Sequence, residues 1–518
     1  MRAAVYNRFW HSMGGGERHS GMIAQVLAHD GVQVDLIGHT DVDRDQLAER
    51  LGLDLSGCRL RIVPDLGDVE TAAIAGISED YDLLVNGSYM SRLAPRARRN
   101  AYLCYFPTPF DADLAPWQRA LARVVGPHLT QHTGGFDYGA GWFPPEGGRR
   151  RVWHWASGDA LLALPPSREQ RVLRMQLGGP ALPRPVELRV EDDEGQALST
   201  VTVRAAFAPH TVTVPASPHV TTLHFRAETF VPGGNDDREL SVAVSGLRLE
   251  GAQYGPRQRL AYSAPWLVRR PHDLSFLRSY DTVMANSEYT RGWIDRLWDI
   301  DADVLFPPIQ VQRLHPAAER EKAVITVGRF FAPGLGHGKR QLEMVEQFAA
   351  ASRAGRLPGW RMHVLGGMED SQRGYVEQVR AAGAGVPVEV VVNAPRTQVE
   401  DLLSTASVFW SATGLGEDEQ ARPWASEHFG MTTVEAMAGG CVPVVIDRAG
   451  QKEIVREGVD GFRWDSTEQL VERTVRLAGD EPLRARMAAS AHLRAQEFSE
   501  DAFSERWHAI AAARSLLA

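Results

Sequence analysis

Cysteine is scarce in this chain, and long hydrophobic runs are missing. The three cysteines among its 518 residues, Cys58, Cys104 and Cys441, are widely separated and form no CxxC pair. An odd number of scattered cysteines predicts neither a disulfide framework nor a zinc site, and it favours a reducing compartment. No run of about 18 apolar residues occurs, and the N-terminal stretch MRAAVYNRFWHS lacks the apolar segment of a signal peptide. We therefore expect a cytoplasmic protein that does not span a membrane.

An excess of positive charge is also missing. The chain has 56 Lys and Arg against 65 Asp and Glu, a formal charge of -9, so no broad surface for nucleic acid is expected. Any anionic ligand must be held by a local site. The basic stretch RLAPRARRN contains Arg92, Arg96, Arg98 and Arg99. We interpret it as a solvated helix face, with contact to anionic lipid at the inner membrane face as the alternative.

The length and composition are those of a multidomain globular protein. Hydrophobic residues make up 44% and charged residues 23% of the chain, and the length predicts about three domains. Apolar strands alternate with amphipathic helices in two regions, from residue 2 to about 110 and from about 323 to 480. This alternation predicts parallel sheets covered on both faces, as in Rossmann-like α/β domains.

The middle of the chain has a different periodicity. Segments such as VELRV, TVTVR and HTVTVP alternate apolar and polar residues between turn-rich stretches, which is typical of a β-sandwich. The predicted architecture is therefore α/β, with two facing Rossmann-like domains and an inserted all-β sandwich. We place the boundaries at 1–135 for the N-terminal Rossmann-like domain, completed by about 257–305, at 136–256 for the sandwich, at 306–485 for the C-terminal Rossmann-like domain, and at 486–518 for C-terminal helices, with a return of these helices to the N-terminal domain as one alternative.

Three tryptophans stand at the start of the expected sandwich. Trp142, Trp153 and Trp155 lie in GWFPPEGGRRRVWHW. Exposed aromatic rings would make a platform for carbohydrate, but Trp153 and Trp155 share one strand face, so a buried aromatic pair is the simpler interpretation.

The first candidate binding loop, WHSMGGGERHS, joins the expected first strand to the first helix. Gly14, Gly15 and Gly16 remove side chains there, so backbone N–H groups and the positive end of the helix can approach an anion or a sugar. The loop does not match GxGxxG, and similar turns occur where a helix simply packs on a strand. Binding and packing both stay open as interpretations of these glycines.

The second candidate loop lies in VGRFFAPGLGHGKRQLEM. Arg329 is expected at a strand end and Lys339 at a helix start, with Gly334, Gly336 and Gly338 between them. Two cations and a helix N-terminus can then converge on one phosphate-sized anion. The alternative is a pair of solvated cations, but the position after a strand and beside the glycines favours a binding role.

The third candidate is EHFGMTTVEAMAGGCVPVVI. N–H groups around Gly430, Met431 and Thr432 are expected at a helix N-terminus, where a diphosphate is favoured. Glu435, about one turn inside the helix, can accept hydrogen bonds from ribose hydroxyls, and Glu427 before the helix can accept from a sugar. The two acids then hold opposite ends of one extended ligand. One capping acid and one surface acid would not explain the join to the apolar strand.

These segments together resemble the retaining glycosyltransferases of family GT4, which have the GT-B fold of two facing Rossmann-like domains. The most specific element is E-x7-E, here Glu427 to Glu435. Three further elements occur in the order expected of the family. They are GGGERHS, NSEYTRGWI, and the pair VGRF and GKRQLEM. The resemblance covers about three quarters of the chain, all but the β-rich insertion.

The resemblance implies roles for these residues. Arg329 and Lys339 would hold the donor diphosphate and stabilise the leaving group, where electrostatic preorganisation has most effect. Glu427 would orient the donor sugar, and Glu435 would hold the ribose. Glu453, in GQKEIV, is a further candidate, with a helix that simply caps the sheet as the alternative. The remaining donor-binding residues are Gly15, Gly16, Phe429, Gly430, Met431 and Thr432.

The resemblance also implies which groups are not needed. Members of this type typically have no established enzyme nucleophile and no essential metal bound by Asp-x-Asp, so we expect no cofactor beyond the nucleotide sugar. The acidic run GEDEQ, from Glu417 to Gln420, is interpreted as a solvated loop, with a gating role as the alternative.

One position departs from the family pattern. Many relatives carry a histidine after the corresponding N-domain strand, and this histidine contacts the donor sugar and is assigned a catalytic role. The present chain has Tyr105, in YLCYFPTPFD. A tyrosine can still donate a hydrogen bond, so Tyr105 stays a candidate catalytic residue. His11 is a substitute candidate, although a lone loop histidine is more often structural.

The leading hypothesis is a retaining glycosyltransferase, a hexosyltransferase of polysaccharide biosynthesis. It would move a sugar from a nucleotide-sugar donor, GDP-mannose first because EHFG resembles mannosyltransferases and a UDP-sugar second, to a glycan or lipid-linked acceptor at the inner membrane face. The alternative is a catalytically silent nucleotide-sugar or glycan-binding protein, which Tyr105 favours. The combination of Arg329, Lys339, Glu427 and Glu435 argues against it. A GT-B epimerase or phosphorylase would need dedicated residues that the sequence does not show.

Overall fold

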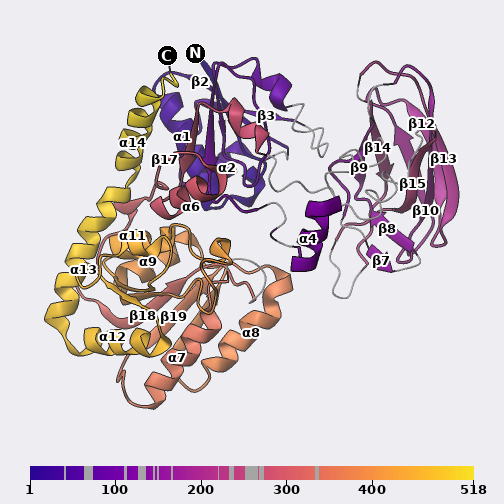
Figure 1. The fold of residues 1–518 in the computed structure, drawn as a ribbon. Helices are drawn as coiled ribbons and strands as arrows, with labels where there is room; N and C mark the ends of the chain where they lie inside the picture. The colour runs from indigo at the N-terminus through magenta and orange to yellow at the C-terminus, as the bar shows by residue number, and fades with distance from the viewer. Residues whose placement is uncertain are drawn as a thin grey trace.

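Two α/β domains and an all-β domain make up the computed structural model (Figure 1). The described residues are 1–39, 42–63, 74–109, 112, 114–125, 136–143, 146–148, 151–164, 167–219, 221–232, 238–250, 267, 274–332 and 338–517. The segment from 257 that was expected to complete the N-terminal domain is therefore described only at residue 267 and from residue 274 onward.

The N-terminal domain is built on a seven-stranded sheet with the order β17-β16-β5-β4-β1-β2-β3, in which all pairs are parallel. Its strands are β1 (Arg2–Tyr6), β2 (Gln33–Gly38), β3 (Cys58–Ile62), β4 (Leu83–Asn86), β5 (Arg99–Cys104), β16 (Thr282–Ala285) and β17 (Asp303–Val304). Its helices include α1 (Gly15–His29), α2 (Arg44–Leu51) and α6 (Glu288–Trp298). Nearly every residue of β1, β2, β4 and β5 is buried, as expected of parallel strands covered on both faces.

The all-β domain consists of two five-stranded sheets, with the orders β13-β10-β15-β8-β7 and β12-β11-β14-β9-β6. The strands are β6 (Asp137–Tyr138), β7 (Glu146–Gly148), β8 (Arg151–Trp155), β9 (Asp159–Leu164), β10 (Arg171–Gly178), β11 (Val186–Glu191), β12 (Ala197–Val203), β13 (Ala208–Val214), β14 (Thr221–Ala227) and β15 (Ala243–Glu250). Alternate residues of β11, Val186, Leu188 and Val190, face the core between the sheets, as the period-two pattern predicts. Trp155 is buried in that core, and Trp142 and Trp153 pack against it half-buried.

The C-terminal domain is built on a parallel six-stranded sheet with the order β20-β19-β18-β21-β22-β23. Its strands are β18 (Glu321–Val327), β19 (Arg361–Gly366), β20 (Val388–Val392), β21 (Ala406–Ser411), β22 (Val442–Ile446) and β23 (Phe462–Trp464). Its helices are α7 (Gln341–Arg353), α8 (Arg373–Ala382), α9 (Arg396–Thr405), α10 (Met431–Ala438), α11 (Gln451–Ile454) and α12 (Thr467–Gly479). Short 3-10 helices are η1 (Trp10–Ser12), η4 (Ser275–Ser279), η5 (Val311–Arg313), η6 (Asp370–Gln372), η7 (Pro423–Ala425) and η8 (Gln496–Phe498).

Two C-terminal helices connect the α/β domains. Helix α13 (Glu481–Ala495) lies against α10 in the C-terminal domain, and α14 (Glu500–Ala513) packs on α1, so both chain ends lie together (Figure 1). Phe503 and Trp507 of α14 are part of the N-terminal core. Arg18 of α1 is buried and donates to Glu500 Oε1 at 2.5 Å. The chain thus returns to its first domain.

The predicted α/β fold class is confirmed, but the prediction of a helix in the basic stretch is wrong. The basic stretch at 92–99 forms no helix, because its backbone runs without regular structure into β5. Arg96 instead pairs with Glu79 at 3.0 Å, and Arg99 pairs with Asp281 at 2.9 Å. Among the described residues, no helix has the length and apolarity needed to cross a bilayer.

Candidate functional site

The centre of the candidate site is an ion pair between Lys339 and Glu427. Lys339 Nζ contacts Glu427 Oε2, and both side chains are about three-quarters or more buried. The buried Thr413 donates a hydrogen bond from Oγ1 to the same carboxylate oxygen at 3.2 Å. Lys339 follows β18 and Thr413 follows β21, and these strands are parallel neighbours, so the carboxyl ends of the strands bring the two loops together.

Helix α10 begins shortly after Glu427, the acid of this ion pair. Gly430 is the residue before the helix and has a φ of 114°, a conformation that favours glycine. A side chain there would also meet Gln451 Nε2 at 2.7 Å. Met431 and Thr432, the first two residues of the helix, are partly exposed, and the first N–H groups of a helix have no partner within the helix. This geometry fits the predicted anion site.

The ring of Phe429 is in a different place from the one the resemblance implies. It is buried in the C-terminal core and stacks on Phe306, with ring centroids 5.5 Å apart. It also contacts Phe498 at 5.4 Å. Packing therefore accounts for the side chain, and only the backbone of Phe429 is left to face a ligand.

The glycine loop of the N-terminal domain faces the C-terminal domain. A side chain on Gly14 would come within 2.8 Å of Arg329 Nη2, and one on Gly15 within 2.7 Å of Met431 Sδ. Glu17 caps the start of α1, because its Oε2 accepts from Gly14 N at 2.8 Å. The absence of side chains in this loop thus permits a close approach of the two domains at the predicted site. Gly338 is described, whereas Gly334 and Gly336 lie outside the described residues.

Tyr105 braces the same glycine loop. Its hydroxyl donates to Gly16 O at 2.5 Å and is 2.9 Å from Ser20 Oγ. A side chain on Gly16 would lie 3.3 Å from the Tyr105 ring. Burial raises the pKa of Tyr105 far above its usual value, so the phenol stays protonated. The other candidate at this position, His11, is exposed and lies near Phe9, with ring centroids 6.4 Å apart.

Glu435 does not meet Glu427 but lies beside a different cation. Its Oε1 is 3.7 Å from Arg396 Nη2, at the start of α9. Burial raises the pKa of Glu435, and Arg396 and Arg18 act in the opposite direction. The two acids of the E-x7-E motif therefore contact separate cations, Lys339 for Glu427 and Arg396 for Glu435. Sequence analysis did not identify Arg396.

The acidic loop at 417–420 is not simply solvated, so that prediction is wrong for Glu417. Its carboxylate accepts from Arg340 Nη2 at 2.8 Å and from Arg422 Nη1 at 2.9 Å. Its carbonyl accepts from Arg448 Nη1 at 2.6 Å. Arg340 directly follows Lys339 and has a φ of 58°. Arg340 thus holds this loop against the Lys339 segment, and Arg422 and Arg448 bind Glu417 from the loop itself and from the segment after β22.

The two α/β domains touch on both sides of the segment that contains the motif. Tyr289 of α6 donates from its hydroxyl to Pro423 O at 3.0 Å. The Glu453 carboxylate accepts from the backbone N–H groups of Glu288 at 2.8 Å and Tyr289 at 3.2 Å, at the N-terminus of α6. Burial raises the pKa of Glu453 to about 7. Glu453 therefore caps a helix of the other domain, which was not predicted.

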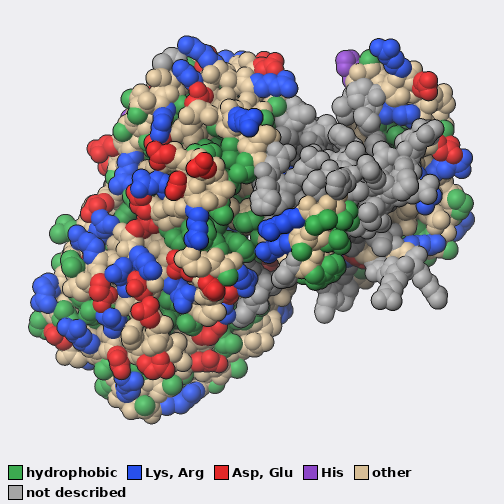
Figure 2. All heavy atoms as spheres, in the orientation of Figure 1, with side chains coloured by type: hydrophobic (Ala, Val, Ile, Leu, Met, Phe, Trp, Pro, Cys, Tyr) green, Lys and Arg blue, Asp and Glu red, His purple; other side chains and the backbone are tan. Residues whose placement is uncertain are grey.

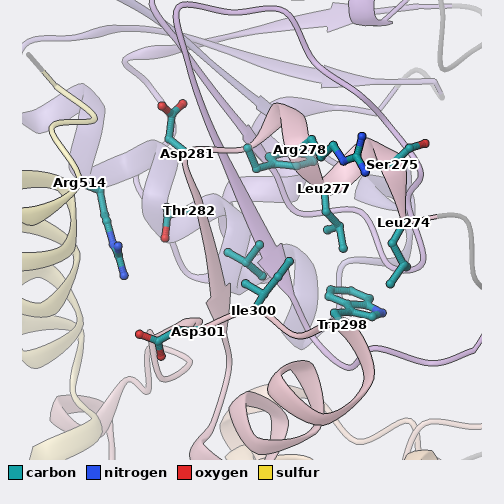
Figure 3. Close-up of a pocket in the computed structure, with 12 residues that line it drawn as sticks. Leu274, Ser275, Leu277, Arg278, Asp281, Thr282, Trp298, Ile300, Asp301 and Arg514 are labelled. Atoms are coloured by element: carbon teal, nitrogen blue, oxygen red, sulfur yellow. The ribbon is translucent and has the colours of Figure 1, made fainter.

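A separate pocket of about 620 Å³ lies away from these residues, at the amino end of β16 (Figure 3). Leu274, Leu277, Trp298 and Ile300 supply its apolar wall, and Arg514, which pairs with Asp303 at 2.9 Å, lies at its other end. None of the predicted site residues lines this pocket.

Several solved structures share the fold of this chain. HepE from Anabaena, in complex with UDP-glucose, superposes with a TM-score of 0.53 at 10% identity, covering 99% of this chain and 100% of that chain. Sucrose-phosphate synthase from Thermosynechococcus elongatus superposes with a TM-score of 0.52 at 11% identity, covering 100% of each chain. The fold is the GT-B fold.

The C-terminal domain also matches by sequence. Residues 311–494 match the family model described as glycosyl transferases group 1. The GDP-Man:Man(3)GlcNAc(2)-PP-Dol alpha-1,2-mannosyltransferase of Homo sapiens is 28% identical over 245 residues, 43% of this chain and 46% of the relative. The enzyme of the same name from Dictyostelium discoideum is 25% identical over 244 residues, again 43% and 46%. The chain thus spans about half the length of these relatives. The match covers Arg329, Lys339, Glu427 and Glu435.

Proposed function

We propose that this protein is a retaining glycosyltransferase of the GT4 type. It transfers a sugar from a nucleotide-sugar donor, GDP-mannose before a UDP-sugar, to a glycan or lipid-linked acceptor. The observation that carries the proposal is the ion pair between Lys339 and Glu427, set beside the start of α10 and opposite the glycine loop of α1.

The ion pair suggests how the donor is received. A diphosphate at the start of α10 offers Lys339 a second anionic partner. Arg329, whose Nη2 lies beside Gly14, adds another cation. When Lys339 turns to the diphosphate, Glu427 is released to accept hydrogen bonds from sugar hydroxyls, while Thr413 still holds it in place. The cations then stabilise the charge that develops on the leaving group, and Glu435 receives the ribose.

The donor is proposed from two supports. The curated relatives named above are GDP-Man-dependent mannosyltransferases, which favours GDP-mannose. A UDP-sugar is second, because a structure with the same fold was solved with UDP-glucose. The positive charge that the site needs comes from Arg329, Lys339 and backbone N–H groups, so we propose that no metal is essential.

A catalytically silent donor-binding protein is the second candidate, and the position of Tyr105 favours it. The hydroxyl of this residue is already engaged with Gly16 O and Ser20 Oγ, so it serves the loop as a brace. A silent protein would bind the nucleotide sugar through the same cations but would not turn it over.

The test combines binding and turnover. Thermal shift with GDP, UDP and their sugar conjugates identifies the base, because a ligand at a hundredfold excess over Kd stabilises the folded state by about 2.7 kcal/mol. Lys339→Ala should remove the shift, whereas Lys322→Ala, at the exposed start of β18, should keep it. Glu427→Ala should abolish sugar transfer but retain nucleotide binding. Binding without turnover in the wild type would favour the silent protein, and no shift with any nucleotide would reject both candidates.

A further inference from the structure

The Glu435 carboxylate is a mostly buried acid that accepts no hydrogen bond from the part of the chain that the structure describes. Its side chain is 21% exposed and lies about one turn inside α10. An ionised carboxylate offers several acceptor positions, and leaving them without donors in a buried place costs free energy. These positions therefore suit a ligand that brings hydroxyl donors.

Arg396 lies next to this carboxylate but does not hydrogen-bond to it. Its Nη2 is 3.7 Å from Glu435 Oε1, whereas a hydrogen bond between such groups is about 2.7 to 3.2 Å long. The guanidinium is held instead by Glu400, whose Oε1 accepts from Arg396 Nε at 2.8 Å. Glu400 is in turn paired with Arg313 at 3.0 Å. Arg396 thus stands at a distance at which it attracts Glu435 without occupying the carboxylate as a donor.

The burial of the acid distinguishes this pair from the other ion pairs of the protein surface. Figure 2 shows Asp and Glu side chains interspersed with Lys and Arg side chains over the visible face of the α/β domains. Most exposed pairs of this kind contribute little to stability. The attraction between Arg396 and Glu435 is stronger, because the acid is largely removed from water.

The charges around Glu435 favour its ionised form mainly through Arg396. Burial raises the pKa of Glu435, and Arg396 of α9 has the larger effect of the two cations that lower it. The other cation is Arg18 of α1, and Glu400 of α9 raises the pKa again. Without Arg396, the Glu435 carboxyl would therefore take up a proton at higher pH.

The other described elements packed on α10 bring no further charge to Glu435. Strands β21 and β22 contain no charged residue. His492 of α13 contacts a backbone carbonyl of α10 at 2.7 Å, and Glu453 of α11 caps α6. Arg396 is therefore the group whose removal changes the charge at Glu435 most.

We propose that Arg396 is a positioning residue through which the protein selects ribonucleotides over 2′-deoxyribonucleotides. It holds Glu435 in place by charge, so that both carboxylate oxygens can accept from the 2′- and 3′-hydroxyls of a ribose. A ligand that lacks one hydroxyl leaves an acceptor of the buried acid without a donor, and a polar site rejects such a ligand. The inference rests on the proposed function, because it takes Glu435 as the group that receives the ribose.

Titration calorimetry tests the proposal without sugar transfer. The probes are nucleoside diphosphates and their 2′-deoxy forms, GDP with dGDP and UDP with dUDP. We expect the wild type to bind the ribose form about tenfold tighter or more, as a hydrogen bond to a buried charge gives. Arg396→Gln should lower this ratio about fivefold or more, mainly through weaker binding of the ribose form. Arg396→Lys keeps the charge and should recover most of the ratio.

The matched control is Arg380→Gln on α8. Arg380 is paired with Glu377 at 2.7 Å on that exposed helix, so the substitution removes the same charge and a similar pair elsewhere in the domain. It should leave both affinities unchanged. Glu435→Gln removes the acid itself, and adding Arg396→Gln to it should change the ratio little, because Arg396 acts through Glu435. The Tm of each variant without nucleotide reports its folding.

The pH dependence separates a positioning role from a structural one. As the pH is lowered from about 8 to about 6, the ratio should fall more steeply in Arg396→Gln than in the wild type, because the pKa of Glu435 is higher when Arg396 is absent. In Glu435→Gln the ratio should not depend on pH. A structural role of Arg396 would change Tm but would not link the ratio to pH.

Three outcomes would overturn the inference. One is an unchanged ratio in Arg396→Gln, another is equal weakening of the ribose and deoxy forms, and the third is the same loss of ratio in Arg380→Gln. Sugar transfer by a wild type whose ratio ignores Arg396→Gln would overturn this inference and keep the proposed function. A ratio that depends on Arg396 in a wild type without turnover would support the inference and favour the silent protein.

Discussion

Phe106 of the N-terminal domain stacks on His428 of the C-terminal domain, with ring centroids 4.2 Å apart and planes 14° from parallel. His428 directly follows Glu427, so the contact between the domains is made by the neighbour of the predicted sugar-binding acid. Phe106 in turn follows Tyr105, which braces the glycine loop. The contact between the two domains is thus made by the residues that directly follow Tyr105 and Glu427.

Phe106→Ala should loosen this contact and lower stability. The side chain is 2% exposed, and replacing a buried phenylalanine by alanine typically costs about 3 kcal/mol or more. Phe106→Leu keeps most of the volume and should cost about 1.5 kcal/mol or less, while it removes the stacked ring. Urea unfolding measures both variants, and the KM for the donor reports the contact. An unchanged KM in Phe106→Leu would show that the stacking has no part in the site.

Thr413→Val should lower kcat about tenfold, because the buried Glu427 carboxylate loses the hydrogen bond at 3.2 Å that keeps it in place when Lys339 moves away. Thr413→Ser retains the hydroxyl and should restore the rate. Steady-state kinetics separates the effects, since a positioning role lowers kcat with little change in nucleotide affinity. Equal rates for the valine and serine variants would remove Thr413 from the site.

The Glu453 carboxyl should make stability depend on pH. Burial raises its pKa in the folded protein from an ordinary value near 4.5 to about 7. The folded state then binds the proton more tightly than the unfolded state between these values, so this contribution is present at low pH and is lost as pH rises through 7. Glu453→Gln cannot ionise, and its Tm should exceed that of the wild type more at pH 8 than at pH 5. A Tm difference that is constant over this range would contradict the assignment.

Treatment with EDTA should leave sugar transfer unchanged. In the proposed site, the diphosphate charge is met by Arg329, Lys339 and the start of α10 rather than by a metal ion. Turnover of the donor with and without the chelator measures this directly. Activity that EDTA abolishes and added Mg²⁺ or Mn²⁺ restores would require a metal in the site.

The fold could be predicted largely because the apolar residues of buried faces recur periodically in the sequence. The apolar run from Val442 to Ile446 forms the fully buried β22, and the alternation at Val186, Leu188 and Val190 places one face of β11 in the sandwich core. The E-x7-E spacing located Glu427 and Glu435 around the start of α10, because both acids belong to one continuous segment.

Contacts between distant segments left no such record. Thr413 meets Glu427 because of how the loop between them folds, and Glu417 is held by Arg340, which is far away in sequence. Glu453 caps a helix of the other domain, a contact that depends on how the two domains approach.

The chain crosses between the α/β domains twice, and the two crossings are joined. Ile309 N donates to Phe498 O at 3.0 Å, and Ile309 forms a parallel bridge with Ser499. Helix α14 packs in the N-terminal domain, in whose core Trp507 lies, and α13 packs on the C-terminal domain. Because the two crossings are hydrogen-bonded to each other, we expect any rotation of one α/β domain relative to the other to bend both crossings together.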